Sequence, residues 1–304
     1  MIKNDVQDVI KNRHHRQRQQ YRCQSCHYQF INQTRKGYAI EQLYAIYAQG
    51  KQTRLELSSQ IGYSRRYLWQ KFDDVIVEPM YASPPLDPVN LIVDATFFGR
   101  ADGVLVFRAN REHLYWQFIQ SETIDEMNRG VDQLGQMGYR FKSVTLDGKK
   151  GMIKRFQARY QGLPIQLCQF HQAQIIRRYL TFNPKTECGH YLKMIMKDFT
   201  SMPAHQFQNL IITWAEIYHD FLAERNEQGQ FKHRRLRSAR RSLFTNMPYL
   251  FTYQNDLIRA IPNTTNSCDG SFAHWKQKIK IHHGLKKHRR HKMINFLLSR
   301  FNLP

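Results

Sequence analysis

Two aspartates follow short apolar runs and have the chemistry to bind a metal ion together. Asp94 comes directly after Leu91–Val93, and Asp147 comes directly after Val144–Leu146. A carboxylate at the end of a buried strand faces the crevice in which α/β proteins bind ligands. Two carboxylates on neighbouring strands need a cation between them, and oxygen ligands select Mg²⁺ or Mn²⁺. Two such ions roughly 3.5–4 Å apart would activate a nucleophile and stabilise the leaving oxygen of a phosphodiester. For either residue alone, an Asx turn or a helix cap is the alternative.

A third carboxylate would complete such a site, and Asp269 is the candidate. Between residues 228 and 304 the only acids are Asp256 and Asp269, among 16 basic residues. Asp269 comes just ahead of a predicted helix over Ala273–Ile281, where it suits a helix N-cap. An acid amid so much positive charge is also suited to binding a metal. The local sequence leaves both roles open.

The apolar runs predict an α/β domain over residues 91–304 that positions these aspartates. Strands are expected at 91–98, 104–108, 114–119, 143–146 and 165–167, and helices at 122–136, 150–160 and 170–180. The following residues read as mostly helical, so we expect a helical insertion at about 183–260. A proline-rich segment, 76–90, is the predicted linker to the preceding part of the chain.

Three short helices before the linker predict a helix-turn-helix DNA-binding segment over residues 37–75. They are expected at 39–49, 53–61 and 64–72, with breaks at Gly50 and Gly62 and an N-cap at Ser64. The last helix would enter the major groove and would pack Tyr67, Leu68 and Phe72 inward. An ordinary three-helix bundle is the alternative. The expected DNA contacts are Arg65, Arg66, Gln70 and Lys71.

The charge of the chain points to an acidic polymer, of which nucleic acid is the leading candidate. The 304 residues carry a formal net charge of +22, of which +7 falls on residues 1–75, +1 on 76–227 and +14 on 228–304. The 16 Tyr and 19 Phe argue against a disordered polycation. No apolar run approaches the roughly 18–20 residues of a membrane span, and no secretion signal opens the sequence. The five cysteines indicate a reducing compartment, so we expect a cytoplasmic location.

Five blocks in order give the chain a family resemblance. They are LIVDATFFG from Leu91, VTLDG from Val144, LCQFH from Leu167, PNTTNSCDGSF from Pro262 and GLKKHRRH from Gly284. Together they resemble bacterial insertion-sequence transposases of the Mutator-like group. That resemblance covers the chain from about residue 10 and implies an RNase H-like catalytic core with two Asp and one Glu, interrupted by a helical insertion. It also implies a bacterial, nucleoid-associated location.

The resemblance assigns roles to individual residues. Asp94 and Asp147 match the two catalytic aspartates, and Asp269 stands in the place of the Glu, one methylene shorter. Cys168 and His171 match the group's Cys-x-x-His, expected beside the fifth strand as support for the active site or DNA. Cys188 and His190 would bring that pair to four zinc ligands, although isolated Cys and His are more often packed or solvated.

The N-terminal segment, 1–36, resembles half of the zinc ribbon found in some members of the group. Cys23 and Cys26 supply two thiolates, and no earlier Cys-x-x-Cys pair precedes them. Structural zinc takes four ligands. Either His14, His15 or His27 substitutes for the missing pair, or the knuckle is truncated, which we favour.

The basic run 276–292 is expected to bind the phosphate backbone beside the scissile bond, with a solvated basic helix as the alternative. The expected contacts are Lys276, Lys280, Lys286, Lys287, Arg289 and Arg290.

The sequence therefore predicts a DDE-type transposase that works on double-stranded DNA as a homo-oligomer. Mg²⁺ or Mn²⁺ on Asp94, Asp147 and Asp269 would cut the element ends, and the exposed 3′-OH would attack target DNA. Zn²⁺ is a possible second cofactor at the N-terminus. The main alternative is a remnant that binds element ends without cutting them. An RNase H-like nuclease acting on RNA or junctions is a third hypothesis, and it leaves the helix-turn-helix unexplained.

Overall fold

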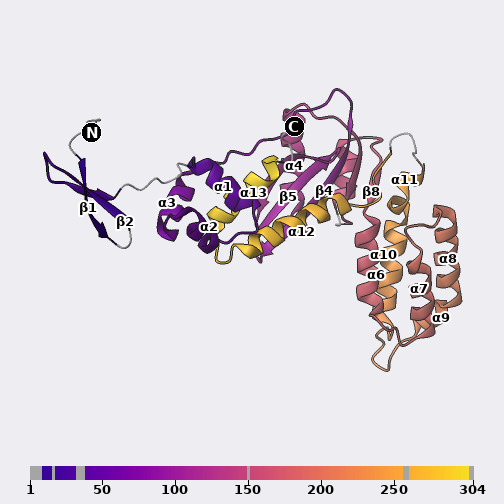
Figure 1. The fold of residues 1–304 in the computed structure, drawn as a ribbon. Helices are drawn as coiled ribbons and strands as arrows, with labels where there is room; N and C mark the ends of the chain where they lie inside the picture. The colour runs from indigo at the N-terminus through magenta and orange to yellow at the C-terminus, as the bar shows by residue number, and fades with distance from the viewer. Residues whose placement is uncertain (1–8, 16–17, 32–37, 149–150, 256–259, 301–304) are drawn as a thin grey trace. The chain divides into compact units, whose positions relative to one another are not determined.

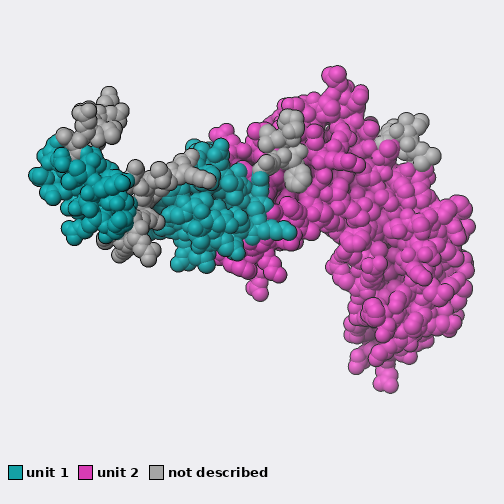
Figure 2. Space-filling model, viewed as in Figure 1, with its two compact units in different colours: residues 1–76 teal, residues 77–304 magenta. Residues whose placement is uncertain are grey.

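The computed structural model describes residues 9–15, 18–31, 38–148, 151–255 and 260–300. The chain divides into two compact units, residues 1–76 and 77–304 (Figure 2). The boundary falls at the beginning of the predicted linker. Residues 75–88 form no helix or strand, and the part from Met80 onward is anchored to the second unit. Met80 N donates to Ser299 Oγ at 2.9 Å, and Tyr139 Oη donates to the carbonyl of Ala82 at 2.6 Å.

The first unit begins with a three-stranded antiparallel sheet. Its strands are β1 (Val9–His15), β2 (Arg18–Cys23) and β3 (Gln29–Ile31), in the order β1-β2-β3. The sequence had indicated only a cysteine knuckle here, because strands so rich in charged and amide side chains lack a clear apolar alternation. Cys23 and Cys26 lie at the turn between β2 and β3, where Cys23 N donates to the carbonyl of Tyr28 at 2.9 Å.

Three helices complete the first unit close to their expected positions. They are α1 (Ile40–Gln49), α2 (Arg54–Ile61) and α3 (Arg65–Asp74). Thr53 and Glu56 form a capping box on α2, and Gly62 ends that helix in a left-handed conformation with φ of 74°. The Ser64 hydroxyl caps α3 by accepting from Tyr67 N at 3.1 Å. Leu68 and Phe72 are buried as expected, but Tyr67 is 38% exposed and its ring lies 5.0 Å from that of Tyr63.

The second unit is built on a five-stranded mixed sheet in the order β6-β5-β4-β7-β8. Its strands are β4 (Val89–Gly99), β5 (Asp102–Ala109), β6 (Glu112–Ile119), β7 (Phe141–Leu146) and β8 (Ile165–Leu167). The first three are antiparallel, whereas β7 pairs in parallel with β4 and β8 in parallel with β7. Every residue of β5 is buried, which agrees with a central strand covered on both faces. The expected mixed α/β class is confirmed.

Helices flank the sheet and continue into a helical insertion (Figure 1). Those between strands or directly after the last strand are α4 (Ile124–Gln136), α5 (Met152–Arg159) and α6 (Gln169–Leu180). The insertion contains α7 (Glu187–Lys197), α8 (Ala204–Ile217), α9 (His219–Ala223), α10 (Arg234–Leu250) and α11 (Thr252–Asn255). The long helix α10 returns along α6, so the two helices lie side by side.

Two helices close the chain. The first, α12 (Asn266–Ile281), packs against β4, and the second, α13 (Lys287–Arg300), packs against β6. They are separated by a turn at Gly284, whose φ is 74°. Part of the basic run 276–292 thus falls on each helix. No helix in the described part of the chain is long and apolar enough to cross a membrane.

Candidate functional site

Asp94 lies in the middle of β4, inside the strand expected at 91–98, so the expectation that its carboxylate faces a crevice from the end of that strand is corrected. Antiparallel pairing of β4 with β5 continues past Asp94, as far as the pair Gly99 and Asp102. Parallel pairing with β7 ends one residue before Asp94, at the pair Val93 and Leu146. Asp94 therefore lies one residue beyond the last residue of β4 that pairs with β7. The strand end expected beside this carboxylate is thus the end of β7.

Asp269 lies in the first turn of α12 and is not its N-cap. The helix begins at Asn266, with Thr265 in the cap position, so it is one to two turns longer than the apolar spacing had indicated. The added turn contains Cys268, which is fully buried and fixes this end of the helix against the core. Asp269, whose side chain is one methylene shorter than that of Glu, is thus positioned at the site by the first turn of a packed helix.

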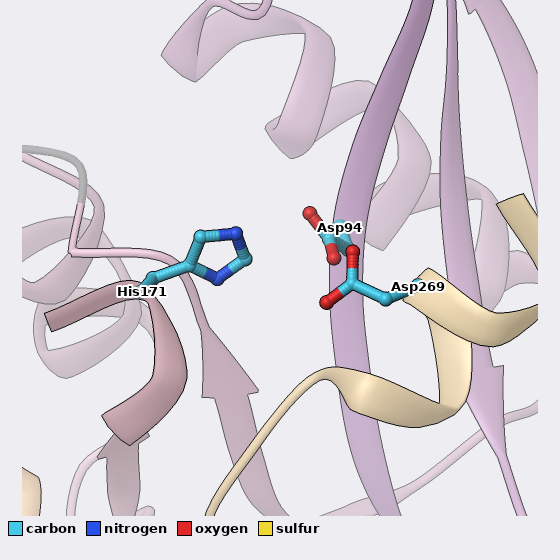
Figure 3. A group of neighbouring side chains, drawn as sticks. All are labelled: Asp94, His171 and Asp269. Atoms are coloured by element: carbon cyan, nitrogen blue, oxygen red, sulfur yellow. The ribbon is translucent and has the colours of Figure 1, made fainter. Parts of the chain in front are cut away.

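His171 joins the two aspartates, from the first turn of α6. One side-chain ligand atom each from Asp94, His171 and Asp269 lies within 4.8 Å of the others. The three side chains come from β4, α6 and α12 and point toward one another (Figure 3). It is the one group of three or more metal-binding side chains found among the described residues. Sequence reasoning had given His171 only an accessory place beside the site.

Cys168 and Thr265 contact the side chain of His171 and orient it. Cys168 is 1% exposed at the N-terminus of α6, and its sulfur accepts from Thr265 N at 3.3 Å and from Thr265 Oγ1 at 3.5 Å. Thr265 Oγ1 also lies 3.4 Å from Nδ1 of His171. Thr265 is fully buried and adjoins α12, so it links the histidine to the helix that carries Asp269. Nothing in its local sequence, a Thr within a polar stretch, had marked it.

Asp147 lies outside the group of three, although it directly follows the last residue of β7. Its side chain is half-buried, and its charge acts on His171. Of the three aspartates of the sequence prediction, Asp94 and Asp269 thus lie in close approach, and Asp147 is linked to them only through its charge on His171.

The electrostatics of the cluster follow from burial and from these neighbours. Burial raises the pKa of Asp94 to about 7; the charge of Asp269 adds to the rise and that of His171 opposes it. A hydrogen bond with Cys168 raises the pKa of His171 to about 9 against the effect of burial. The pKa of Cys168 is lowered because hydrogen bonds from His171 and Thr265 outweigh its burial. The raised pKa favours the protonated histidine, which faces the two carboxylates (Figure 3).

The oxygen atoms of the cluster fit a divalent cation. Asp94 Oδ1 accepts from Ala95 N at 2.8 Å, while Oδ2 of Asp94 and Oδ2 of Asp269 are buried without a hydrogen-bond partner among the described residues. A buried carboxylate oxygen without a donor is costly unless a cation contacts it. Two such oxygens from side chains of one cluster are hard donors that suit Mg²⁺ or Mn²⁺.

Arg108 on β5 fixes the beginning of α12, a role that the sequence had not indicated. One of its nitrogens, Nη1, donates at 2.6 Å both to the carbonyl of Ser267 and to Oγ of Ser271, on either side of Asp269. Nη2 donates to the carbonyl of Arg111 at 3.0 Å. Arg108 is 8% exposed, and both of its Nη atoms donate to neutral groups, while its Nε is buried without a hydrogen-bond partner among the described residues; it acts as a clamp on the helix.

The predicted DNA-contacting residues are mostly exposed. Arg65, Arg66 and Gln70 are exposed on α3, whereas Lys71 is half-buried and pairs with Asp74 at 3.3 Å. In the basic run, Lys276, Lys280, Lys286 and Lys287 are exposed, and Arg289 is half-buried. Arg290 forms an ion pair with Asp102, which also accepts from His291 Nε2 at 2.6 Å. These two contacts tie α13 to the β4–β5 turn.

The cysteines form no multi-ligand metal group in the described residues. Cys23 and Cys26 lie within one turn, but no third His, Cys or acidic ligand atom joins them there, and Nδ1 of His27 lies 3.0 Å from an Arg22 nitrogen. Cys188 is buried on α7, where its carbonyl accepts from Trp214 Nε1 at 2.9 Å. Neither it nor His190 belongs to the cluster around His171.

Comparison with known proteins gives distant structural likenesses only. No protein-family model matches the chain, and no curated protein matches it. It is similar to the Drosophila P element transposase strand transfer complex, at a TM-score of 0.46 and 9% identity over 87% of this chain and 92% of that chain. It is also similar to the Mos1 strand transfer complex, at a TM-score of 0.21 and 9% identity over 69% of this chain and 77% of that one. Both TM-scores are too low to establish a shared fold.

Proposed function

We propose that this protein is a DDE-type DNA transposase, with Asp94, Asp147 and Asp269 as its catalytic carboxylates. The observation that carries the proposal is the convergence of Asp94 and Asp269, 175 positions apart in the sequence, with a buried, unpartnered oxygen on each. The ordered sequence blocks that resemble Mutator-like transposases contain all three aspartates. The mixed sheet, followed by a helical insertion and then by α12, is compatible with the RNase H-like core that this resemblance implies.

Asp94 and Asp269 would hold a divalent ion between their free oxygens, and Asp147 would hold the same ion or a second one. When bound, Mg²⁺ or Mn²⁺ lowers the pKa of a water nucleophile and stabilises charge on the phosphate oxygens. His171 occupies the opposite side of the cluster as a cation that offsets the two carboxylates. Cys168 and Thr265 keep the imidazole oriented, and the clamp from Arg108 keeps Asp269 opposite Asp94.

The DNA would lie along the exposed face of α12. Lys276 and Lys280 follow Asp269 by seven and eleven positions, which places them on the same face of the helix. A phosphate backbone that contacts these lysines therefore approaches the carboxylates directly. Lys286, Lys287 and Arg289 would extend the contact, whereas Arg290 is engaged with Asp102 and serves the docking of α13.

The first unit would supply recognition of the element ends. The exposed side chains of Arg65, Arg66 and Gln70 on α3 suit a recognition helix in the major groove. Lys71 would join them by giving up its pairing with Asp74. Cys23 and Cys26 would bind Zn²⁺ if a second chain or an additional segment supplied further ligands. Assembly as a homo-oligomer on DNA belongs to this proposal.

The test is cleavage and strand transfer by Asp94→Asn and Asp269→Asn variants of the full chain. Supercoiled plasmid that carries the element, and a pre-nicked end, are incubated with Mg²⁺ or Mn²⁺. Loss of one catalytic group typically lowers the rate by 10²–10⁴-fold, so we expect both variants to lose turnover while DNA binding is retained. Asp125→Asn is the matched control, because Asp125 is exposed on α4, away from the cluster. Wild-type-like cleavage by Asp94→Asn would refute the assignment, and binding without cleavage by the wild type would indicate a remnant.

A further inference from the structure

A cavity of about 590 Å³ opens between α6 and α10, next to the carboxylate site. The residues that line it include Arg178, Tyr179, Ser238, Arg241 and Ser242. Gly148, the residue directly after Asp147, lines its inner end. A cavity of this size is in the usual range for binding sites, which is roughly 300–1,000 Å³.

The helix periodicity connects this cavity to the cluster. On α6, Ile175 and Arg178 follow His171 by four and seven positions, so the three residues share one face of the helix. Arg178 therefore lies about 10 Å along the helix from His171. At the inner end, a Cβ added to Gly148 would lie 3.5 Å from Asn246 Nδ2 on α10. One continuous face thus runs from the histidine of the site into the cavity.

The lining favours an anion. No acidic residue contributes to it, and Arg178 and Arg241 are exposed side chains that form no ion pair in the described part of the chain. Ser238, Arg241, Ser242 and Thr245 follow the spacing i, i+3, i+4 and i+7, which places their side chains on the one face of α10 that borders the cavity. Guanidinium groups combined with hydroxyl and amide donors are the usual protein ligands of phosphodiesters.

We infer that this cavity binds the phosphodiester backbone of the DNA strand that leaves the carboxylate site. The inference rests on the proposed function, since it takes DNA as the substrate and Asp94, Asp147 and Asp269 as the place of cleavage. Arg178 and Arg241 each contact one phosphate a short distance from the scissile bond. The insertion thereby acts as a second wall of the DNA site, opposite the lysines of α12.

The experiment compares two double variants that remove equal charge from the same two helices. Arg178→Gln/Arg241→Gln removes both guanidinium groups of the cavity. Arg177→Gln/Arg240→Gln, the control, changes the exposed neighbours that do not line it. Both are made in the full chain, and binding of a fluorescein-labelled duplex with a single-stranded 3′ extension is measured by anisotropy over a series of salt concentrations.

Loss of two phosphate contacts lowers the slope of log affinity against log salt by about 1.4–1.8. We expect that reduction for the cavity variant and a slope close to wild type for the control. An equal reduction in both variants would overturn the inference, because it would reflect general surface charge. All four arginines are exposed, so matching thermal melting curves are expected and exclude misfolding as the cause.

The design separates this inference from the proposed function. Binding is measured in the Asp94→Asn background, where cleavage is not needed for the readout and the cavity is unaltered. If the wild type never cleaves DNA, the proposed function fails while the binding comparison still decides whether the cavity contacts phosphate. If cleavage is confirmed but the two double variants bind alike, only the cavity inference fails.

Discussion

His113 is a buried residue whose protonation state couples stability to pH. It lies fully buried on β6, with its ring centroid 5.2 Å from that of Trp275 on α12. Burial, together with the charge of Arg108, lowers its pKa to about 3, whereas an unfolded histidine titrates near 6.5. The unfolded chain therefore takes up a proton that the folded chain excludes. Stability from this residue is complete above about pH 6.5 and is lost as the pH falls toward 3.

Replacing His113 with Phe tests this coupling. Phe keeps an aromatic ring of similar volume beside Trp275 and removes the titrating group. Between about pH 6 and pH 4, we expect the free energy of unfolding of the wild type to fall relative to that of His113→Phe by about 1.4 kcal/mol per pH unit. Urea denaturation at several pH values measures both. A difference between the two proteins that stays constant with pH would contradict a buried neutral histidine.

At the scale of the elements, hydrogen bonds between a strand and a helix hold the site in place. Arg108 connects β5 to both sides of Asp269 on α12 through Ser267 and Ser271. Removing its guanidinium takes the charged donor away from the Ser267 carbonyl and the Ser271 hydroxyl, a loss of about 1–3 kcal/mol. Because these two acceptors flank Asp269, their loss destabilises the first turn of α12. The Asp269 carboxylate is then expected to move.

Arg108→Met is therefore expected to weaken Mn²⁺ binding as well as stability. A displacement near 1 Å at such a site lowers turnover by about 10²-fold, and the same shift separates the two metal-binding oxygens. Titration calorimetry with Mn²⁺ and thermal melting are measured on the same samples. Arg108→Lys keeps the charge and one donor, so we expect partial rescue, and Arg100→Met is the exposed control in the β4–β5 turn. Unchanged Mn²⁺ affinity in Arg108→Met would show that the clamp serves stability alone.

The elements themselves were largely predictable, because apolar periodicity is a local signal. The strand at 165–167 and the helix beginning after Ser64 were expected from neighbouring residues alone. Asp94 falls inside the strand expected at 91–98, but the end of the β7 pairing just before it was not predictable, since it depends on strands distant in the sequence. The length of α12 was also missed, because polar residues such as Asn266 and Ser267 begin it and contacts distant in the sequence, the burial of Cys268 and the clamp from Arg108, hold that end in place. Pairing and packing partners distant in the sequence decide such features.

At the scale of the molecule, positive charge is concentrated at the two ends of the sequence. The first 75 residues carry +7 and the last 77 carry +14, with +1 between them. The first end belongs to the unit that contains α1, α2 and α3, and the second to α10, α12 and α13 of the other unit. Two basic surfaces joined by a short connection bind one DNA molecule more tightly than either alone, because the second contact is intramolecular.

Simultaneous binding of one DNA by both surfaces predicts additive salt effects. Arg65→Gln/Arg66→Gln and Lys276→Gln/Lys280→Gln each remove two phosphate contacts, so each is expected to lower the slope of log affinity against log salt by about 1.8. The fourfold variant is then expected to lower it by about 3.6, as measured by anisotropy on a duplex long enough to reach both surfaces. Lys185→Gln/Lys197→Gln, on exposed positions of the insertion, controls for net charge. If the fourfold variant loses no more slope than the more affected double variant, the two surfaces do not act on the same DNA, and the recognition helix and the carboxylate site work on separate molecules.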